Sequence, residues 1–176
     1  ILQPTYAKIT STMKKALQKL KKEVCEIKSP KDIETSKIEK FIKNTQVALM
    51  AGGAGTKFRE IVETEETNKN AHELPNGETM NERVVKMYRD AGVEDFIALV
   101  YHGADSIVET LKNKKKFGVN VKYSYDPDRP VGKGGAVLNA LENGSIDKEK
   151  HLIVHNPDDV ITSFQEKFVN HIIQGH

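Results

Sequence analysis

The chain has 176 residues, which is enough for one domain with a sizeable hydrophobic core. Its 27 Lys and Arg against 25 Asp and Glu leave a net charge of +2, which is too small to indicate nucleic-acid binding. No apolar run approaches the roughly 18 residues of a membrane span, so neither a nucleic-acid nor a membrane partner is expected. Cys25 is the single cysteine, which excludes an internal disulfide, and no leader pattern is recognisable, so a cytoplasmic protein is expected.

The N-terminal part of the chain is predicted to be helical. Apolar residues recur at three- and four-residue spacing over 5–28, which predicts an amphipathic helix whose other faces are rich in lysine. The Ser-Pro pair at 29–30 is typical of a helix start and predicts a second helix over about 30–43. Two helices are too little for a stable core. We therefore expect residues 1–45 to be an N-terminal helical segment that packs on a domain spanning 46–176.

Strand and helix patterns alternate through the rest of the chain. Apolar runs bounded by turn residues predict strands at 46–50, 94–102, 119–126 and 151–155. Helical periodicity predicts helices at 78–92, 104–118, 134–144 and 162–174. This alternation is typical of an α/β fold with a Rossmann-like, mostly parallel sheet and helices on both faces. Ligands of such sheets bind at the carboxyl ends of the strands, and the long polar loop at 63–77 is expected to be a lid or binding loop.

Three glycines follow directly after the first predicted strand, at Gly52, Gly53 and Gly55. Glycines at a strand end let the backbone approach a ligand closely and direct several N–H groups at it, which favours phosphate binding over a purely structural turn. Two common phosphate loops are excluded by their spacing. The Walker pattern needs a glycine directly before its lysine, whereas Lys57 follows Thr56, and the dinucleotide pattern needs a third glycine at position 58, which is Phe58. The Gly-Lys pair at 132–133 does not fit the Walker pattern either, because Lys133 is followed by Gly134 where that pattern needs Ser or Thr. We refer to residues 51–57 as the glycine loop.

The glycine loop resembles that of the nucleotidyltransferases that make nucleotide sugars, whose pattern reads roughly L-A-G-G-x-G-T-R-L. Further stretches match the family's order of motifs. They are the helix start G-E-T-M-N-E-R-V at 77–84, the helix, strand and helix at 90–111, the loop P-V-G-K-G-G-A-V at 130–137 and the strand end I-V-H-N-P-D-D-V-I at 153–161. By this resemblance the chain is identified as a member of the sugar-nucleotidyltransferase family.

The resemblance implies an enzyme that joins an NTP to a sugar 1-phosphate and releases pyrophosphate, with Mg²⁺ as its cofactor. In-line attack of the sugar phosphate on the α-phosphorus needs no covalent enzyme intermediate, so positioning and charge neutralisation are the protein's task. Two alternatives stay open. One is a nucleotide-binding regulatory or assembly subunit that keeps the fold without turnover, and the other is a nucleotidyltransferase for a non-sugar phosphorylated acceptor. A homo-oligomer is also left open.

The resemblance also assigns roles to individual residues. Lys57 stands where the family usually has arginine and is expected to contact the β- and γ-phosphates. Asp158 matches the aspartate that holds Mg²⁺, so it is the expected metal ligand and, with Lys57, an expected catalytic residue. The other residues expected to bind substrate are Ala51, Gly52, Gly53, Gly55 and Thr56 around the triphosphate, Gly134 and Gly135 beside the nucleobase or ribose, and Lys69.

Several features depart from the family pattern. The Pro-Lys pair that supplies a phosphate-binding lysine is absent, and Lys69 is the nearest candidate for that role. Asp126 and Asp128 stand near the position where many relatives read the base with Gln or Glu. Relatives continue well beyond the position of His176, so the domain is expected to be incomplete at its C-terminal side. Among the histidines, His155 is the one expected nearest the site.

Overall fold

The computed structural model describes residues 15, 18–19, 34–62, 67–112 and 117–159. The chain divides into two compact units, one over Ile1–Ile33 and one that begins at Glu34. The helices expected near the two ends of the chain lie almost entirely outside the described residues. Within the described residues, the second unit carries all of the strands.

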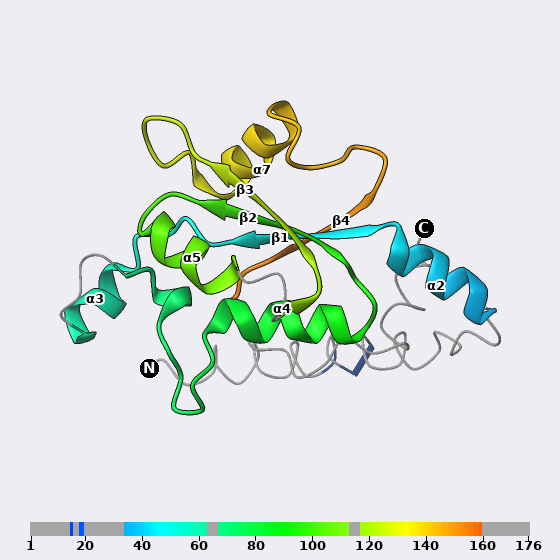
Figure 1. The fold of residues 1–176 in the computed structure, drawn as a ribbon, viewed down its shortest axis with the longest axis horizontal. Coiled ribbons are helices and arrows are strands. Elements are labelled where there is room, and N and C mark those ends of the chain that lie inside the picture. The colour runs from blue at the N-terminus through cyan, green and yellow to red at the C-terminus, as the bar shows by residue number, and fades with distance from the viewer. Residues whose placement is uncertain (1–14, 16–17, 20–33, 63–66, 113–116, 160–176) are drawn as a thin grey trace. The chain divides into compact units, whose positions relative to one another are not determined.

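Four parallel strands form one sheet in the order β3-β2-β1-β4 (Figure 1). The strands are β1 Thr45–Met50, β2 Asp95–Val100, β3 Asn120–Tyr125 and β4 His151–His155. The helical elements are α2 Thr35–Lys43, α3 Thr56–Val62, the 3-10 turn η1 Lys69–Ala71, α4 Met80–Asp90, α5 Ala104–Leu111 and α7 Gly132–Glu142. The arrangement confirms the Rossmann-like α/β fold that the alternation of patterns predicted.

β1 lies inside the sheet and is almost completely buried. Val47, Ala48 and Leu49 are each 0% exposed. Ala48 is paired with Ile97 of β2 on one side and with Val154 of β4 on the other. Because successive side chains of a strand point to opposite faces, a strand covered on both faces must be apolar at every position. This is why β1 appears in the sequence as a continuous apolar run instead of an alternating one.

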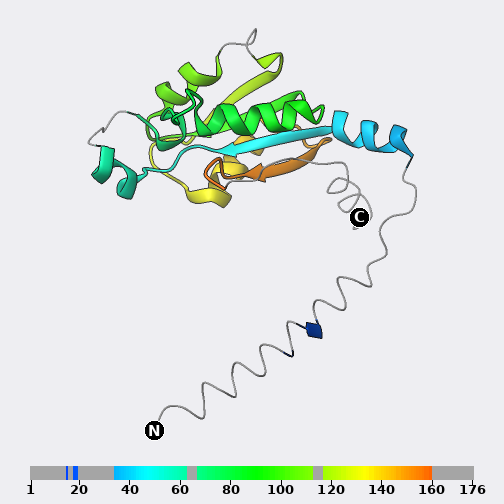
Figure 2. The same ribbon diagram turned by 90° about the horizontal axis from the view of Figure 1, so that it is seen from below.

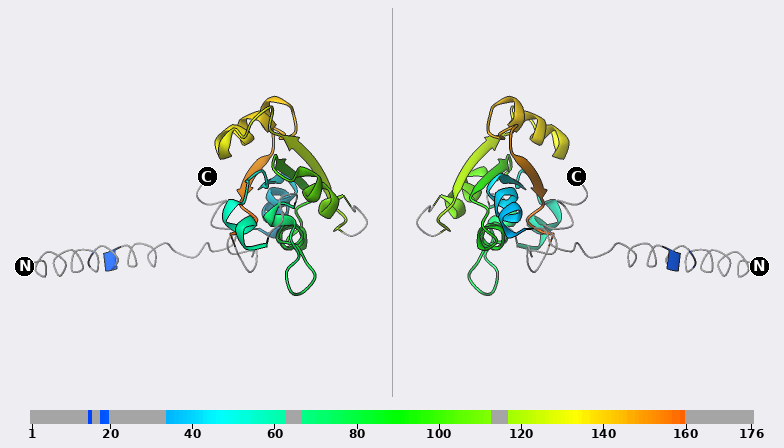
Figure 3. Two further views of the ribbon diagram at one scale, coloured as in Figure 1. Left: turned by 90° about the vertical axis from the view of Figure 1, so that its left-hand side faces the viewer. Right: turned by 90° about the vertical axis from the view of Figure 1, so that its right-hand side faces the viewer.

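Helices cover both faces of the sheet because the strand order reverses after β3. Right-handed crossovers from β1 to β2 and from β2 to β3 bring α4 and α5 to one face. The return from β3 to the far side of β1 brings α7 to the opposite face (Figure 3). There α7 packs with Ala136 and Ala140 on a cluster that includes Ala48, Ile97 and Leu99. The small side chains of α7 let the helix approach the sheet closely.

α2 is attached at the amino end of β1, opposite the end where α3 follows the strand (Figures 1 and 2). The rings of Phe41 and His151 stack with their centroids 4.5 Å apart. The backbone N–H of His151 donates to the carbonyl oxygen of Asn44 at 2.8 Å. The helix begins at Thr35, later than the Ser-Pro pair predicted, because Glu34 has an extended backbone with ψ of 131°. These contacts connect α2 to β4.

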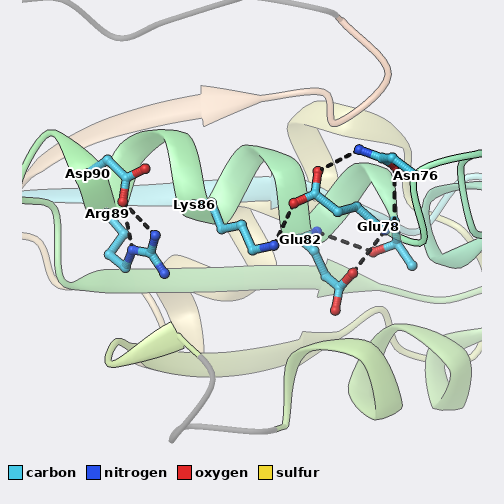
Figure 4. A network of polar contacts seen from close by, with 7 residues as sticks. Asn76, Glu78, Glu82, Lys86, Arg89 and Asp90 are labelled. Carbon is cyan, nitrogen blue, oxygen red and sulfur yellow. Dashed lines mark hydrogen bonds and ion pairs between the residues drawn. The ribbon is translucent and has the colours of Figure 1, made fainter.

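The start of α4 is held by a network of polar groups (Figure 4). The Thr79 hydroxyl accepts the N–H of Glu82 at 3.2 Å, and the Glu82 carboxylate accepts the N–H of Thr79 at 2.9 Å, which together form a capping box. Just before it, Glu78 accepts hydrogen bonds from the side chains of Asn76 at 3.1 Å and Lys86 at 2.5 Å. The stretch G-E-T-M-N-E-R-V is therefore a strong local signal for a helix start.

α3 and η1 are elements that the sequence patterns did not predict. α3 contains no buried residue, so it lacks the apolar stripe from which a helix is recognised in sequence. η1 is a single turn begun by Asn68, inside the region expected to be a loop at 63–77. Across the described residues, no helix has the length and apolar character needed to cross a bilayer.

Candidate functional site

A cleft of about 370 Å³ opens at the carboxyl ends of the strands. This volume lies within the range of small-molecule sites, which is roughly 300–1,000 Å³. The cleft is lined by residues that follow each of the four strands, by the start of α7 and by η1. The lining consists of Met50, Gly52, Gly53, Ala54, Lys69, Leu99, His102, Asp126, Pro130, Gly132, Lys133, Ala136, Asn156, Asp158 and Asp159. A cleft in this place agrees with the expectation for a parallel sheet.

The glycine loop leaves β1 in a tight bend against the end of β2. Ala51 is buried, and its N–H donates to the carbonyl oxygen of Leu99 at 2.9 Å. A Cβ atom on Gly52 would lie 3.3 Å from the backbone nitrogen of Tyr101, so a side chain there would press on β2. Gly53 is exposed and has nothing within 4 Å of that position. Gly52 thus serves the packing of the loop, whereas Gly53 leaves space at the cleft.

The second half of the glycine loop continues into α3. Gly55 has a φ of +61°, which favours glycine, and its carbonyl oxygen accepts the N–H groups of Phe58 and Arg59. Thr56 and Lys57 lie exposed in the first turn of α3. Neither they nor Gly55 belong to the lining of the cleft.

Lys69 and Asp158 form an ion pair at the cleft. Nζ of Lys69 lies 2.5 Å from Oδ2 of Asp158, and the two side chains are 32% and 47% exposed. The hydrogen bond from Lys69 lowers the pKa of Asp158 below its ordinary value, outweighing partial burial, and the charge of Lys133 acts in the same direction. Asp158 is therefore ionised at neutral pH. The fold brings these two predicted residues together although 89 positions separate them in the sequence.

Asn68 is a residue at the site that sequence reasoning missed. It is only 4% exposed, and its Nδ2 donates to the carbonyl oxygens of Ala51 and His102, each at 2.8 Å. It thereby connects the glycine loop to the loop that follows β2. One local signal could have identified it. Asn is a residue type that favours Asx turns, in which its side chain accepts the N–H two residues later, and Oδ1 of Asn68 accepts the N–H of Asn70.

Gly134 and Gly135 lie on α7, and neither lines the cleft, although three of their neighbours on the helix do. A Cβ atom on Gly135 would lie 2.7 Å from Cβ of Val131, whereas nothing lies within 4 Å of that position on Gly134. Gly135 is therefore needed for the packing of the first turn of α7 itself.

One of the two acidic residues expected near the base lies at the cleft. Asp126 lines it, and Asp128 does not. Oδ2 of Asp126 accepts the N–H of Val131 at 3.3 Å, so this carboxylate also supports the start of α7.

His155 supports the turn that carries Asp158 and Asp159 without lining the cleft itself. Its Nε2 lies 3.2 Å from the carbonyl oxygen of Asp159, and its Nδ1 lies 3.0 Å from the hydroxyl of Tyr88. Because a carbonyl oxygen can only accept, Nε2 donates to Asp159, and in the neutral ring Nδ1 is then the acceptor for the hydroxyl of Tyr88. Burial raises the pKa of Tyr88 to about 12, so the phenol keeps the proton that it donates. The buried pair connects α4 to the turn after β4.

Comparison with known families identifies the family of the chain. Residues 46–176 match the family profile described as nucleotidyl transferase. The chain belongs to this family. The matched range contains every residue that lines the cleft, including Lys69 and Asp158.

Relatives of this chain are similar to it over part of their length. The bifunctional protein GlmU of Staphylococcus epidermidis is 30% identical over 117 residues, which are 66% of this chain and 23% of that protein. The bifunctional protein GlmU of Staphylococcus saprophyticus is 30% identical over 115 residues, 65% of this chain and 23% of that protein. The matched part therefore spans less than a quarter of the length of these relatives.

A solved structure supports the fold of the chain. A Bacillus anthracis protein assigned as a glucose-1-phosphate thymidylyltransferase, crystallised with sucrose, superposes with a TM-score of 0.57 at 19% identity. The match covers 74% of this chain and 50% of that one. At this identity the likeness concerns the fold alone.

Proposed function

We propose that this nucleotidyl transferase joins an NTP to a sugar 1-phosphate, giving a nucleotide sugar and pyrophosphate, with Mg²⁺ as its cofactor. The observation that carries the proposal is the contact of Lys69 with Asp158 in a cleft at the carboxyl ends of the strands. An ammonium group suits a phosphate oxygen, and a carboxylate suits a hard cation held against that phosphate. The cleft thus offers both charges that bound Mg²⁺ and triphosphate require.

The triphosphate is proposed to lie between the glycine loop and α7. Lys69 and Lys133 line the cleft and would neutralise phosphate charge. Gly53 leaves open space in which a phosphate can approach the backbone N–H groups. α7 begins at the cleft with Gly132, and the amino end of a helix favours anions. Donors from three separate segments would therefore surround the same ligand.

Lys57 is proposed to contact the β- and γ-phosphates, as the family resemblance implies. In the described structure it is exposed on α3 and outside the lining of the cleft. The contact therefore requires its long side chain, or α3, to move toward the cleft when the NTP binds. Lys57 would then complete a charge cluster whose other members already lie at the cleft.

The acidic residues after β4 fit an Mg²⁺ ion that binds together with a nucleotide. In the described part of the chain, no group of three or more His, Cys, Asp or Glu side chains could hold a metal ion. Asp158 and Asp159 nevertheless line the cleft, and Mg²⁺ is commonly held by one or two carboxylates together with substrate phosphates. Asp158 is proposed as the ligand, with Asp159 beside it. Bound Mg²⁺ would polarise the phosphate oxygens and stabilise their negative charge.

The residues of the cleft would act by binding and orienting the two substrates. An oxygen of the sugar phosphate forms a bond to the α-phosphorus of the NTP, and the bond from that phosphorus to the oxygen bridging to the β-phosphate breaks, so pyrophosphate leaves. Lys69 would hold phosphate charge close to this centre, and Asp158 would hold the metal ion. No protein atom becomes covalently bound, so the rate depends on alignment and charge neutralisation.

A coupled assay of pyrophosphate release tests the proposal. The purified chain is incubated with Mg²⁺, each of the four common NTPs and a panel of sugar 1-phosphates. We expect release with at least one NTP and sugar pair and none when Mg²⁺ is removed by a chelator. NTP binding without release in any pair would contradict the enzyme and favour a regulatory subunit. Release only with a non-sugar phosphorylated acceptor would contradict the sugar assignment.

Substitutions at the cleft test the residue assignments. We expect Lys69→Ala and Asp158→Ala each to weaken binding of Mg²⁺·NTP by about tenfold or more, because each removes a charge that the ligand meets. Lys57→Ala is expected to weaken binding too. Lys150→Ala is the matched control, because it removes a lysine paired with Asp95 at the amino ends of the strands. Binding unchanged by Lys57→Ala and Asp158→Ala would contradict the assigned site.

A further inference from the structure

Asn68 joins its own turn to two other segments, the glycine loop and the stretch from His102 to Ser106. Its Nδ2 donates to Ala51 and, more weakly at 3.4 Å, to Gly53, both in the glycine loop, and to His102 after β2. Its own backbone N–H donates to the hydroxyl of Ser106 on α5 at 3.0 Å. Each of these segments contributes to the lining of the cleft, through Lys69, Gly53 and His102. Asn68 therefore lies where the loops that form the cleft meet.

The hydrogen bonds of Asn68 require a carboxamide. Its NH₂ group provides the two donors that the carbonyl oxygens of Ala51 and His102 accept, and its Oδ1 accepts the N–H of Asn70 at 3.0 Å. An aspartate of the same size would direct a negative oxygen at two carbonyl oxygens, and a serine would be too short to reach them. The side chain is also buried, so each lost bond leaves a backbone group without its partner.

The position of Lys69 follows from these bonds. The Asx turn of Asn68 begins η1, and Lys69 is the next residue. The stem of Lys69 passes over Gly55, where a Cβ atom would lie 3.5 Å from Cβ of the lysine. Its Nζ then reaches Asp158. Asn68 thus fixes the backbone from which Lys69 extends and, through Ala51, the loop beside it.

We propose that Asn68 is a positioning residue, which holds Lys69 against Asp158 and holds the glycine loop in the shape that a triphosphate requires. It acts through these groups and does not contact the ligand itself, since it is absent from the lining of the cleft. The consequence for nucleotide binding rests on the proposed function. The consequence for the position of Lys69 does not, so the two are measured separately.

The first experiment measures the reactivity of Lys69 in the absence of any ligand. The full chain and its Asn68→Ala variant are treated briefly with an acetylating N-hydroxysuccinimide ester, and modification at each lysine is followed by mass spectrometry. We expect acetylation of Lys69 to be about threefold faster or more in the variant, because its ion pair is no longer held. Lys150, which has its own ion pair with Asp95, is the internal control and should react as in the wild type.

Gln46→Ala is the matched control for a loss of stability. Gln46 is likewise a buried amide, whose side chain donates to the carbonyl oxygen of Asp147 at 2.5 Å and accepts its N–H at 3.0 Å, at the amino end of the sheet. This variant should lower the melting temperature without changing acetylation of Lys69. Equal acetylation of Lys69 in the wild type and in Asn68→Ala would overturn the proposal, and so would a rise of the same size in Gln46→Ala.

The second experiment is a double-mutant cycle read by calorimetric titration with the Mg²⁺ complex of whichever of ATP, GTP, CTP or UTP the wild type binds most tightly. We expect Asn68→Ala and Lys69→Ala each to weaken binding by about tenfold. The double variant should lose much less affinity than the roughly hundredfold expected if the two residues acted independently. A roughly hundredfold loss of affinity in the double variant would overturn the proposal. No binding of any NTP by the wild type would contradict the proposed function while the acetylation result still decides the role of Asn68.

Asn68→Ser serves where the alanine variant does not fold, because its hydroxyl keeps an acceptor for the N–H of Asn70 and is too short to donate to the carbonyl oxygens of Ala51 and His102. It should give the same rise in Lys69 acetylation. If neither variant folds while Gln46→Ala does, Asn68 is a residue of general stability and the proposal is overturned.

Discussion

Gly134 and Gly135 are adjacent glycines of α7 with different surroundings. A Cβ atom on Gly135 would lie 2.7 Å from Cβ of Val131, a separation that real Cβ atoms essentially never show. Nothing lies within 4 Å of the same position on Gly134. Packing within the chain therefore requires glycine at 135 only, and a requirement for glycine at 134 would have to come from a ligand.

We predict opposite effects on stability for the two alanine substitutions. Gly135→Ala should lower the free energy of unfolding by about 2 kcal/mol, because the first turn of α7 must shift. Gly134→Ala should raise it by about 0.5 kcal/mol, because alanine is the better helix former. Urea unfolding measures both, and a loss of stability in Gly134→Ala would contradict the open surroundings.

The same variant tests the expected contact with the nucleobase or ribose. If the nucleotide approaches Gly134, Gly134→Ala should bind Mg²⁺·NTP more weakly although it is the more stable protein. Binding equal to that of the wild type would remove Gly134 from the site.

At the scale of elements, a polar cluster ties three strands together at their amino ends. Asp95 at the start of β2 accepts hydrogen bonds from Lys150, just before β4, at 2.5 Å and from Asn120 at the start of β3 at 3.1 Å. Burial alone would raise the pKa of Asp95, but these two hydrogen bonds outweigh burial and lower it. The hydrogen bond to Asp95 raises the pKa of Lys150. The pair is therefore ionised across the neutral range.

We predict that Asp95→Asn lowers the free energy of unfolding by about 1 kcal/mol at pH 7. The folded pKa of Asp95 lies below its unfolded value of about 3.9, so its contribution is present above that value and is lost as the pH falls through the folded pKa. The contribution of Lys150 is present below its unfolded pKa of about 10.4 and is lost as the pH rises through its raised folded value. Urea titrations of the wild type and of Asp95→Asn at pH 7 and pH 2 measure this. The difference between their free energies of unfolding should be smaller at pH 2.

Glu109→Gln is the control for this series. Glu109 and Lys112 form an ion pair on the surface of α5, where both side chains are more than half exposed, so its removal should leave stability unchanged within error at either pH. A difference between Asp95→Asn and the wild type that persisted unchanged at pH 2 would contradict an electrostatic origin.

At the scale of the whole molecule, the unit that begins at Glu34 contains the sheet, helices on both of its faces and every residue that lines the cleft. α2 joins this unit through the stacking of Phe41 on His151. Thr45, the last residue before the boundary drawn from sequence, is 1% exposed in β1. The contacts of α2 therefore favour a structural boundary before Glu34.

We predict that a chain beginning at Glu34 unfolds cooperatively and binds Mg²⁺·NTP as the full chain does, because it keeps the core and the cleft. A chain beginning at Gln46 should melt at a lower temperature, because it loses α2 and the buried Thr45. Thermal unfolding followed by circular dichroism compares the three proteins. Equal melting of the two shortened chains would show that α2 adds nothing to the sheet unit.

Local patterns were sufficient for the four strands, for α4, α5 and α7, and for the loop at the end of β1. β4 was predicted at its observed bounds, because its apolar run is bounded by turn residues that act over a few positions. α3 was not predicted, because a short helix with no buried side chain carries no apolar stripe. The expectation that Lys69 and Asp158 belong to one site came from resemblance, and the fold brings them into contact.

By itself, the sequence determined the parallel α/β architecture. It also placed the glycine loop and the turn that carries Asp158 and Asp159 at the carboxyl ends of strands. Both follow from periodicity and turn chemistry, which are short-range properties. Only the tertiary structure decided which lysine pairs with Asp158 and that Asn68 joins the loops around the cleft. The physical reason is that these contacts join residues brought together by the crossing of α4, α5 and α7 over the sheet. Their hydrogen bonds and ion pairs depend on distances in space, which no local pattern encodes.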